Sequence, residues 1–133
     1  MENHFICPNC HGHLKVGNHI IFRIRNRKKD YGLLLLDPKI GNYQSIKHPE
    51  FEFQQGEALE FYCPLCHQNL GADFDQNLTH VEMIDKDNKE HDIYFSRIAG
   101  EESTYQVSGD TVRASGEHSG KYTYFKMSAK FKN

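Results

Sequence analysis

The sequence has no tryptophan, only five alanines among 133 residues, and no long run of apolar residues. Its longest aliphatic run, Leu33–Leu36, is far shorter than the roughly 20 residues that a membrane-spanning helix requires, so such a helix is excluded. Alanine favours helices, whereas the nine phenylalanines and seven tyrosines favour strands. The hydrophobic share of 38% is too high for a disordered chain. These features predict a single folded domain, residues 1–133, that is mainly β with little helix.

The chain also lacks an excess of positive charge, because 16 Lys and Arg residues face 18 Asp and Glu, for a net charge of -2. Domains that bind nucleic acid are usually basic, so this balance disfavours a nucleic-acid partner. The first ten residues, MENHFICPNC, contain neither the basic nor the apolar segment of a secretory signal. We therefore expect a cytoplasmic protein with reduced cysteines and no membrane partner.

Cysteine is scarce too, but its four copies form two matching brackets, CPNC at 7–10 and CPLC at 63–66. Aligning CPNCHGHL (7–14) with CPLCHQNL (63–70) gives five identities in eight positions at an offset of 56. The chain therefore contains a repeated Cys-x-x-Cys knuckle.

Two such knuckles supply the four sulfur ligands that Zn2+ prefers in structural sites, at about 2.3 Å from the metal. Four thiolates leave no open coordination position, so the metal cannot activate a water molecule. We therefore expect one structural Zn2+ per chain in a protein that is not an enzyme and has no catalytic residue. Iron could occupy the same sulfurs, because the spacing does not separate the two metals. The predicted metal ligands are Cys7, Cys10, Cys63 and Cys66.

Paired CPxC knuckles of this kind resemble those of zinc ribbons and of rubredoxin-like metal sites. The resemblance covers residues 7–14 and 63–70 and implies that each knuckle lies on a β-hairpin. Three further strings, GLLLLDPKIGNY, EFYCPLC and FSRIAGEESTY, look like bacterial zinc-ribbon proteins of unassigned activity. This likeness implies no activity for the present chain.

The chain departs from that family in two respects. His11 and His67 follow the second cysteine of each knuckle, where ribbons commonly have glycine, and histidine tolerates positive φ better than most residues. In addition, 52 residues separate the knuckles, where compact ribbons have roughly 15 to 20. The longer loop costs about 1 kcal/mol against about 10 to 16 kcal/mol for zinc binding, so the site tolerates it. We therefore expect a large antiparallel sheet over residues 15–62, inserted into a zinc-ribbon-like site.

Alternation of apolar and polar residues predicts antiparallel hairpins along the chain. A turn over 26–30 joins the first two strands, and a turn at Gly56 precedes a strand that leads into Cys63. The four consecutive leucines at 33–36 could form a partner-binding edge, but a buried central strand explains them more simply and is the prediction. The expected strands are 16–24, 31–36, 51–53, 59–61, 81–83, 93–95 and 104–107.

Residues 78–133 are expected to form a C-terminal hairpin region. Its main hairpin carries an acidic, exposed tip at 85–92. A short helix capped by Asp110 is expected over 110–114, followed by a basic, frayed tail at 121–133.

Two classes of function follow from these features. The leading hypothesis is a non-enzymatic module that presents its sheet to a protein partner, because the net charge is negative. The alternative is a nucleic-acid-binding ribbon that uses a basic hairpin, although a solvated turn explains the same charges. If the metal is iron, rubredoxin-like electron transfer is a third hypothesis. The basic hairpin consists of Arg23, Arg25, Arg27, Lys28 and Lys29.

Several further patterns have two interpretations. Both brackets also match Cys-x-x-Cys-His, the attachment motif of c-type haem, and each bracket could form a redox disulfide. The lack of an export signal disfavours haem, and the lack of a βαβ pattern disfavours a redox disulfide. Surface imidazoles, rather than a second metal site, are expected for His4, His11, His13 and His19. A charged loop, rather than an active site, is expected for Arg97, Glu101, Glu102, Ser103 and Thr104.

Overall fold

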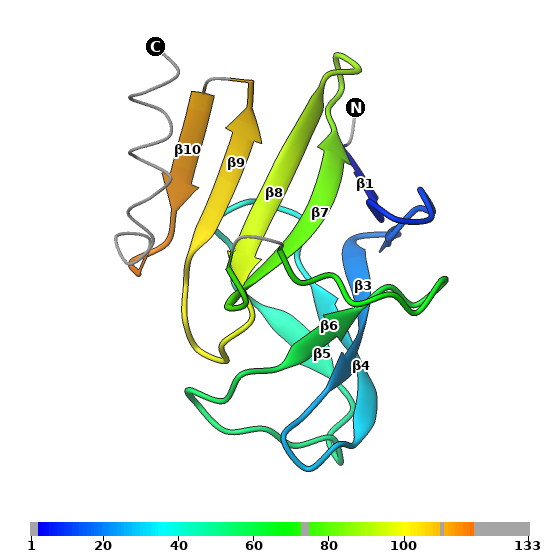
Figure 1. Cartoon of the computed structure of the whole chain (residues 1–133), viewed down its shortest axis with the longest axis vertical. Helices are drawn as coiled ribbons and strands as arrows, with labels where there is room; N and C mark the ends of the chain where they lie inside the picture. Colours follow the sequence, from blue (N-terminus) through cyan, green and yellow to red (C-terminus); the bar gives the residue numbers. More distant parts are fainter. Residues whose placement is uncertain (1–2, 73–74, 110, 119–133) are drawn as a thin grey trace.

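The computed structural model describes residues 3–72, 75–109 and 111–118. These residues form ten β-strands in two antiparallel sheets of five strands each, and no helix occurs among them (Figure 1). The prediction of a mainly β fold with little helix is therefore confirmed.

The first sheet combines one strand from the N-terminus with four from the second half of the chain. Its order is β1-β7-β8-β9-β10, and each described neighbouring pair is antiparallel. The expected hairpin with an exposed tip is present, because β7 and β8 are joined by a turn in which the Asp85 N–H donates to the Lys89 carbonyl (3.0 Å). The strands are β1 (His4–Ile6), β7 (Leu78–Ile84), β8 (Glu90–Ser96), β9 (Thr104–Ser108) and β10 (Thr111–Ser115).

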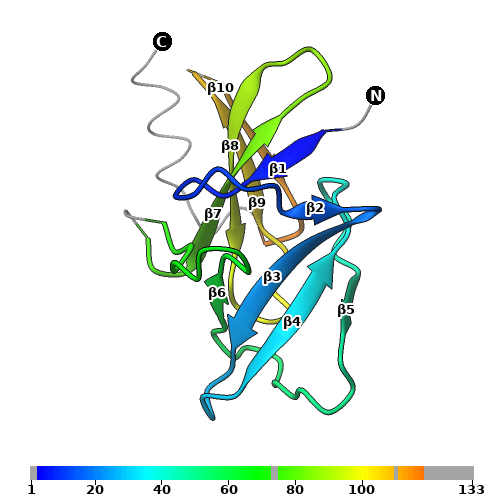
Figure 2. The same ribbon diagram turned by 90° about the vertical axis from the view of Figure 1, so that its right-hand side faces the viewer.

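The second sheet contains the strands that lie between the two knuckles in sequence. Strand β3 is its centre, with β4 on one side and both β2 and β6 on the other, while β5 pairs with β4 (Figure 2). The strands are β2 (Lys15–Val16), β3 (His19–Arg25), β4 (Tyr31–Leu36), β5 (Ser45–Lys47) and β6 (Glu60–Tyr62).

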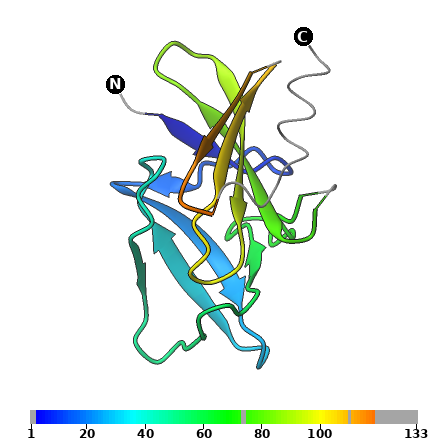
Figure 3. The same cartoon turned by 90° about the vertical axis from the view of Figure 1, so that its left-hand side faces the viewer.

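The core lies between the sheets because every second side chain of the central strands points there. On β3, Ile20, Phe22 and Ile24 are buried, and the residues between them are partly exposed. The Phe22 ring contacts Phe61 of the second sheet and Phe95 of the first, at centroid distances of 5.3 and 5.5 Å. The β8–β9 loop, yellow in Figure 3, reaches from the first sheet toward the second, where the Gly56 N–H donates to the Ala99 carbonyl (2.8 Å).

Strand β4 corrects the expectation of a strand buried on both faces. Leu34 is 4% exposed, whereas its neighbour Leu33 is 52% exposed. Strand β4 lies between β3 and β5 in its sheet, but only the face that carries Leu34 is buried. Antiparallel sheets commonly pack one face on the core and expose the opposite face to solvent. A run of consecutive leucines is therefore compatible with a strand that is buried on one face alone.

The expected strand over 51–53 is also absent, because these residues lie in the loop between β5 and β6. Phe51 is nevertheless buried, since its ring packs directly over Gly32 of β4; a Cβ added at that glycine would lie 2.6 Å from the ring. The alternation in the sequence therefore reflected side-chain burial and not strand pairing.

The expected helix over 110–114 is wrong where it can be examined, because Thr111–Ser115 form β10, which pairs with β9. The β-branched Thr111 and Val112 favour a strand, and Gly109, with φ of 57°, supplies the left-handed conformation that a tight hairpin turn requires. Asp110 itself and the predicted basic tail at 121–133 lie outside the described residues.

Candidate metal centre

Each knuckle is a short hairpin, and the two are built alike. A β-bridge closes the first between Ile6 and His13, and a β-bridge closes the second between Tyr62 and Asn69. Both bridges obey the offset of 56 residues found in the sequence.

The hydrogen bonds inside the knuckles match as closely as their sequences. The N–H of Cys7 donates to the Gly12 carbonyl, and that of Cys63 to the Gln68 carbonyl, both at 3.0 Å. Each first cysteine then accepts a hydrogen bond at its carbonyl oxygen from the histidine four residues later, at 2.9 Å in both knuckles. The backbone thus fixes both cysteines of each bracket on the inside of a tight turn.

Backbone N–H groups also point at the sulfur atoms. The Asn9 N–H lies 3.3 Å from the Cys7 Sγ, and the Leu65 N–H lies 3.3 Å from the Cys63 Sγ. The N–H groups of Cys10 and Cys66 approach the same two sulfurs at 3.5 and 3.4 Å. Such donors stabilise the thiolate form that a metal ion requires.

The four sulfur atoms converge on one point between the knuckles. Cys7 Sγ lies 3.8 Å from Cys66 Sγ, and Cys10 Sγ lies 3.8 Å from Cys63 Sγ, while all four atoms lie within 4.8 Å of one another. A tetrahedron with metal–sulfur bonds of about 2.3 Å has sulfur–sulfur edges of about 3.8 Å. The two cross-knuckle distances therefore match a tetrahedral site of four cysteines. The spacing of the cysteines is the signal that led to this cluster.

Burial raises the pKa values of the cysteine thiols, whereas hydrogen bonds from backbone N–H groups lower them. Cys7 and Cys63 are completely buried, and this burial raises the pKa of Cys7 to about 12 and raises the pKa of Cys63 as well. A hydrogen bond from the Gln68 N–H is the main cause that lowers the pKa of Cys66. Burial therefore favours the neutral thiol form of Cys7 and Cys63, whereas a metal ion binds their thiolates, so metal binding releases protons.

The two histidines that follow the second cysteine of each knuckle adopt a backbone conformation that favours glycine. The φ angle is 61° at His11 and 65° at His67, in the left-handed region. The expectation that histidine tolerates this position is confirmed.

The knuckles also mark the two places where the chain passes between the sheets. The first knuckle connects β1 of the first sheet to β2 of the second, and the second knuckle connects β6 of the second sheet to the chain that returns to β7 of the first. A metal held by both knuckles would therefore link the sheets at both crossings.

The basic hairpin predicted from the sequence is divided between a strand and a turn. Arg23 and Arg25 lie on β3, and the other three cations lie at the exposed β3–β4 turn. The Arg23 guanidinium stacks 4.1 Å from the centre of the Tyr31 ring. Arg25 instead forms an ion pair with Glu60. The N–H of Arg27 donates to a Glu57 carboxylate oxygen (2.7 Å) and thereby lowers the pKa of that carboxyl group.

The other candidate residues are also placed by the structure. His4 and His13 contact each other edge to face, with ring centroids 5.4 Å apart. Among the described residues, the four cysteines are the one group of three or more His, Cys, Asp or Glu with ligand atoms at metal-binding distance. Arg97 is turned toward backbone, because its guanidinium donates to the carbonyls of Leu59 and Gln76.

Two features of the surface and interior were not found from the sequence. One is the exposed face of the second sheet, which includes Leu33 and Tyr31. The other is a cavity between the sheets. Both depend on which strands pair and how the sheets stack, and alternation along one chain does not carry that information.

Within the part of the chain that the structure describes, no helix could cross a membrane. A scan against protein-family models finds no match for the sequence, and neither the curated proteins nor the solved structures contain a match. The assignment of the site rests on the positions of the four cysteine sulfurs, which lie at metal-binding distance from one another.

Proposed function

We propose that the four cysteines hold one structural Zn2+ and that the protein is a non-enzymatic interaction module of zinc-ribbon-like type. The observation that carries the metal site is the pair of 3.8 Å cross-knuckle sulfur distances. Four sulfur ligands complete a tetrahedral shell, so no position is left for a substrate or an activated water. Convergence of both brackets on one point also favours a single metal over two separate haem attachments or two separate disulfides.

Zinc is proposed over iron because closed sites of four thiolates are the common structural sites of Zn2+. Elemental analysis and a visible spectrum of protein purified without added metal test this. One zinc per chain in a colourless solution is the expected result. Iron with a visible absorption would replace this proposal with rubredoxin-like electron transfer.

The interaction surface that we propose is the outer face of the second sheet, on the side opposite the core. Strand pairing places Val16 beside His19, Arg23 beside Leu33, and Leu35 beside Ile46 on this face. Val16, Leu33 and Ile46 are 63%, 52% and 53% exposed. Large apolar side chains gathered on one face are typical of protein-binding surfaces. We refer to Val16, Ile21, Leu33, Leu35 and Ile46 as the outer apolar patch.

Charge beside the patch defines the kind of partner. Arg23 lies directly next to Leu33, and the basic β3–β4 turn follows along the same strand pair. We therefore propose a partner protein with an apolar contact surface bordered by carboxylates.

Copurification with tagged protein tests whether the outer apolar patch binds a partner protein. A partner retained by the wild type should be lost with Leu33→Glu and with Ile46→Glu. It should be kept with Lys86→Glu, a control at an exposed residue of the β7–β8 turn, away from the patch and the metal site. A partner that binds the patch variants as well as the wild type would contradict the proposal. Sedimentation of the pure chain shows whether that partner is a second copy.

A second candidate function, single-stranded nucleic-acid binding, rests on one observation. Tyr31 is 51% exposed, has Arg23 over its ring, and lies 6.1 Å from the Tyr62 ring. Exposed aromatic rings beside cations form stacking platforms for bases. The ion pair of Arg25 with Glu60 and the proximity of Glu57 to Arg27 weaken this candidate.

Salt separates the two candidates. Binding to phosphates must weaken steeply as salt rises, and it must be lost when Arg25, Arg27 and Lys28 are changed to alanine. An oligonucleotide titration at two salt concentrations measures this. Absent or salt-insensitive binding would reject the nucleic-acid function.

A further inference from the structure

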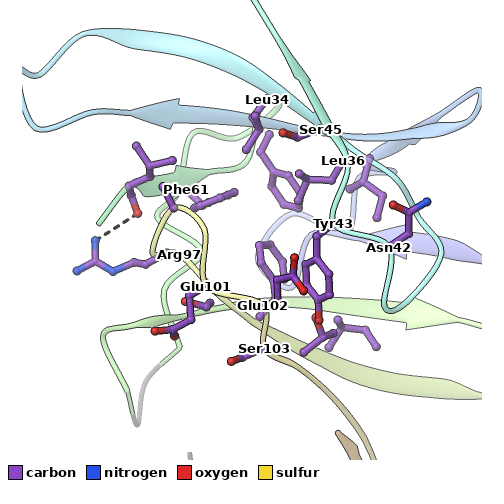
Figure 4. Close-up of a pocket in the computed structure, with 18 of the residues that line it drawn as sticks. Leu34, Leu36, Asn42, Tyr43, Ser45, Phe61, Arg97, Glu101, Glu102 and Ser103 are labelled. Atoms are coloured by element: carbon purple, nitrogen blue, oxygen red, sulfur yellow. Dashed lines mark hydrogen bonds between the residues drawn. The ribbon is translucent and has the colours of Figure 1, made fainter. Parts of the chain in front are cut away.

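The cavity between the two sheets has a mainly apolar wall, which includes Leu34, Leu36 and Phe61 (Figure 4). A shallow groove on the outer face of the second sheet differs from this cavity, because a cation borders the groove. One wall of the groove is formed by strands β3 and β4, and the other by the second knuckle. The residues that line it are Arg23, Tyr31, Gly32, Leu33, Pro64 and His67.

Strand pairing places Arg23 at the border between the outer apolar patch and the second knuckle. Its register partners are Leu33 on β4 and Tyr62 on β6, the strand that leads into the knuckle. Leu33 is 52% exposed, so apolar contact area is available directly beside the cation. A partner that covers the patch would therefore also reach Arg23.

The guanidinium of Arg23 is held by a ring and has no carboxylate partner. It lies over the Tyr31 ring, 4.1 Å from the ring centre, and forms no hydrogen bond or ion pair with any residue that the structure describes. Arg25 differs, because it is already paired with Glu60. A guanidinium donates hydrogen bonds in its own plane, so stacking on a ring leaves its N–H groups accessible to an acceptor. The ring contact also reduces the side-chain freedom that binding would remove.

These features fit a carboxylate better than a nucleic acid. A carboxylate accepts two parallel hydrogen bonds from one guanidinium, so a single cation is enough. A nucleic-acid strand presents successive phosphates and gains affinity from several cations. On this face the second arginine is paired with Glu60, and Arg23 already covers one side of the Tyr31 ring, where a base would otherwise stack. Leu33 and Pro64 add apolar surface that suits a protein partner.

We propose that the groove binds the carboxylate of a glutamate or aspartate of the partner protein, with Arg23 as the residue that selects it. This inference rests on the proposed protein-binding function of the outer apolar patch. The carboxylate accepts two hydrogen bonds from the Arg23 guanidinium, and the residue next to it in the partner is apolar and contacts Leu33. The groove thereby recognises one acidic residue beside an apolar one.

Two peptides that differ in one charge test the proposal, namely acetyl-Leu-Glu-Leu-amide and acetyl-Leu-Gln-Leu-amide. Each is titrated into the metal-loaded full chain, and binding is followed by backbone amide shifts and by the Nε–H signal of Arg23. The glutamate peptide should bind saturably and about fivefold more tightly than the glutamine peptide, which is the upper end of what an exposed ion pair contributes. The largest shifts should fall on the residues that line the groove, and the preference should decrease as salt rises.

Variants test whether Arg23 makes the selection. Arg23→Gln should bind the two peptides equally, and Arg23→Lys should restore only part of the preference, because an ammonium group cannot form the bidentate pair. The matched control Arg113→Gln, at an exposed arginine of β10 in the first sheet, should keep the full preference. A cooperative melting curve of Arg23→Gln shows that the variant is folded.

Three results would overturn the proposal. The first is a glutamate peptide that does not bind saturably or that binds no better than the glutamine peptide. The second is a preference that survives Arg23→Gln. The third is a short oligothymidylate that displaces the glutamate peptide and shifts the same residues, which would assign the groove to a nucleic acid.

Copurification separates failure of the groove from failure of the proposed function. A partner that is lost with Leu33→Glu but fully retained by Arg23→Gln would contradict the groove and leave the outer apolar patch supported. A partner that both variants retain would contradict the groove and the patch together. Loss of the partner with either variant, and its retention by Arg113→Gln, is the expected result.

Discussion

Two histidines are held in a backbone conformation that disfavours side chains. His11 and His67 have φ angles of 61° and 65°, and both side chains are exposed. The left-handed conformation costs a residue with a Cβ roughly 1 to 2 kcal/mol, and glycine avoids that cost. The knuckle hydrogen bonds from these residues to the first cysteines keep them there.

Replacing His11 by glycine should therefore stabilise the protein. We expect a gain of about 0.5 to 1 kcal/mol in the free energy of unfolding, because the relieved strain exceeds the added flexibility of the unfolded chain. Urea denaturation of the metal-loaded protein measures it. The matched change His19→Gly, in strand β3, should destabilise instead. A loss of stability in His11→Gly would mean that the imidazole makes a contribution of its own.

Asp85 is a second residue with a predictable effect, this time on pH dependence. Its carboxylate accepts hydrogen bonds from His91 (2.7 Å) and from the N–H groups of Asp87 and Lys89 (2.9 Å each). These bonds, with that of His91 first, lower the pKa of Asp85 below its ordinary 3.8. Because the pKa is lower in the folded state, ionised Asp85 stabilises the β7–β8 hairpin above pH 3.8, and this stabilisation is lost as the pH falls through the folded-state value.

An NMR titration of the Asp85 carboxyl carbon checks this directly. The midpoint should lie below 3.8, and the Asp87 and Lys89 amide shifts should follow the same curve. Changing His91 to alanine should move the midpoint upward. A midpoint at or above the ordinary value in the wild type would contradict the hydrogen-bond network.

At the scale of elements, the contact between strand β4 and the β5–β6 loop depends on a missing side chain. A Cβ at Gly32 would lie 2.6 Å from the Phe51 ring. Gly32→Ala should therefore destabilise the protein by about 1 to 3 kcal/mol, the usual cost of overpacking. Thermal melting measures it, with Leu33→Ala as the control because that neighbouring side chain is 52% exposed and should have little effect. Equal stability of wild type and Gly32→Ala would show that the ring moves freely.

The elements that sequence patterns predicted well are those with strict alternation. Strand β3, the turn after it and the β7–β8 hairpin follow from the period of two, because one face of each strand is buried. The expected strand over 16–24 is wrong at its start, because a turn at residues 17–18 separates β2 from β3. The pattern failed where burial or pairing had another cause. Phe51 and Phe53 alternate because a loop packs on a sheet, and the residues of β10 form a strand because the edge of β9 is there to pair with them.

The candidate site was more predictable than the fold around it. Each Cys-Pro-x-Cys bracket is a local pattern, and the preference of Zn2+ for four sulfur ligands predicted that the two brackets come together. The outer apolar patch and the cavity arise instead from pairs such as Leu35 with Ile46, which lie on different strands joined by a loop. Their positions depend on strand register and sheet stacking, which no local pattern contains.

At the scale of the whole molecule, the four cysteines lie where the chain crosses between the sheets. Each knuckle is closed by a backbone hydrogen bond across its arms, since the Leu14 N–H donates to the Phe5 carbonyl and the Leu70 N–H to the Phe61 carbonyl, both at 2.8 Å. The sheets also share the cluster of Phe22, Phe61 and Phe95. The two sheets are thus held together by the phenylalanine cluster in the core and would also be linked by a metal ion bound at the knuckles.

If the four cysteines bind zinc as proposed, loss of one buried ligand should unfold the whole domain and not only the knuckle that carries it. Zinc binding contributes about 10 to 16 kcal/mol in comparable sites, whereas whole domains are stable by about 5 to 15 kcal/mol. We expect Cys63→Ser to give an insoluble protein or one without a cooperative melting transition, and chelation of the wild type to have the same effect. Calorimetry measures the transition, and amide exchange at Leu14 and Leu70 reports the two knuckles. The neighbouring exposed substitution Gln68→Ser should melt like the wild type. If Cys63→Ser also melts normally, the apolar contacts between the sheets suffice, and the cysteine cluster has a role other than holding the fold.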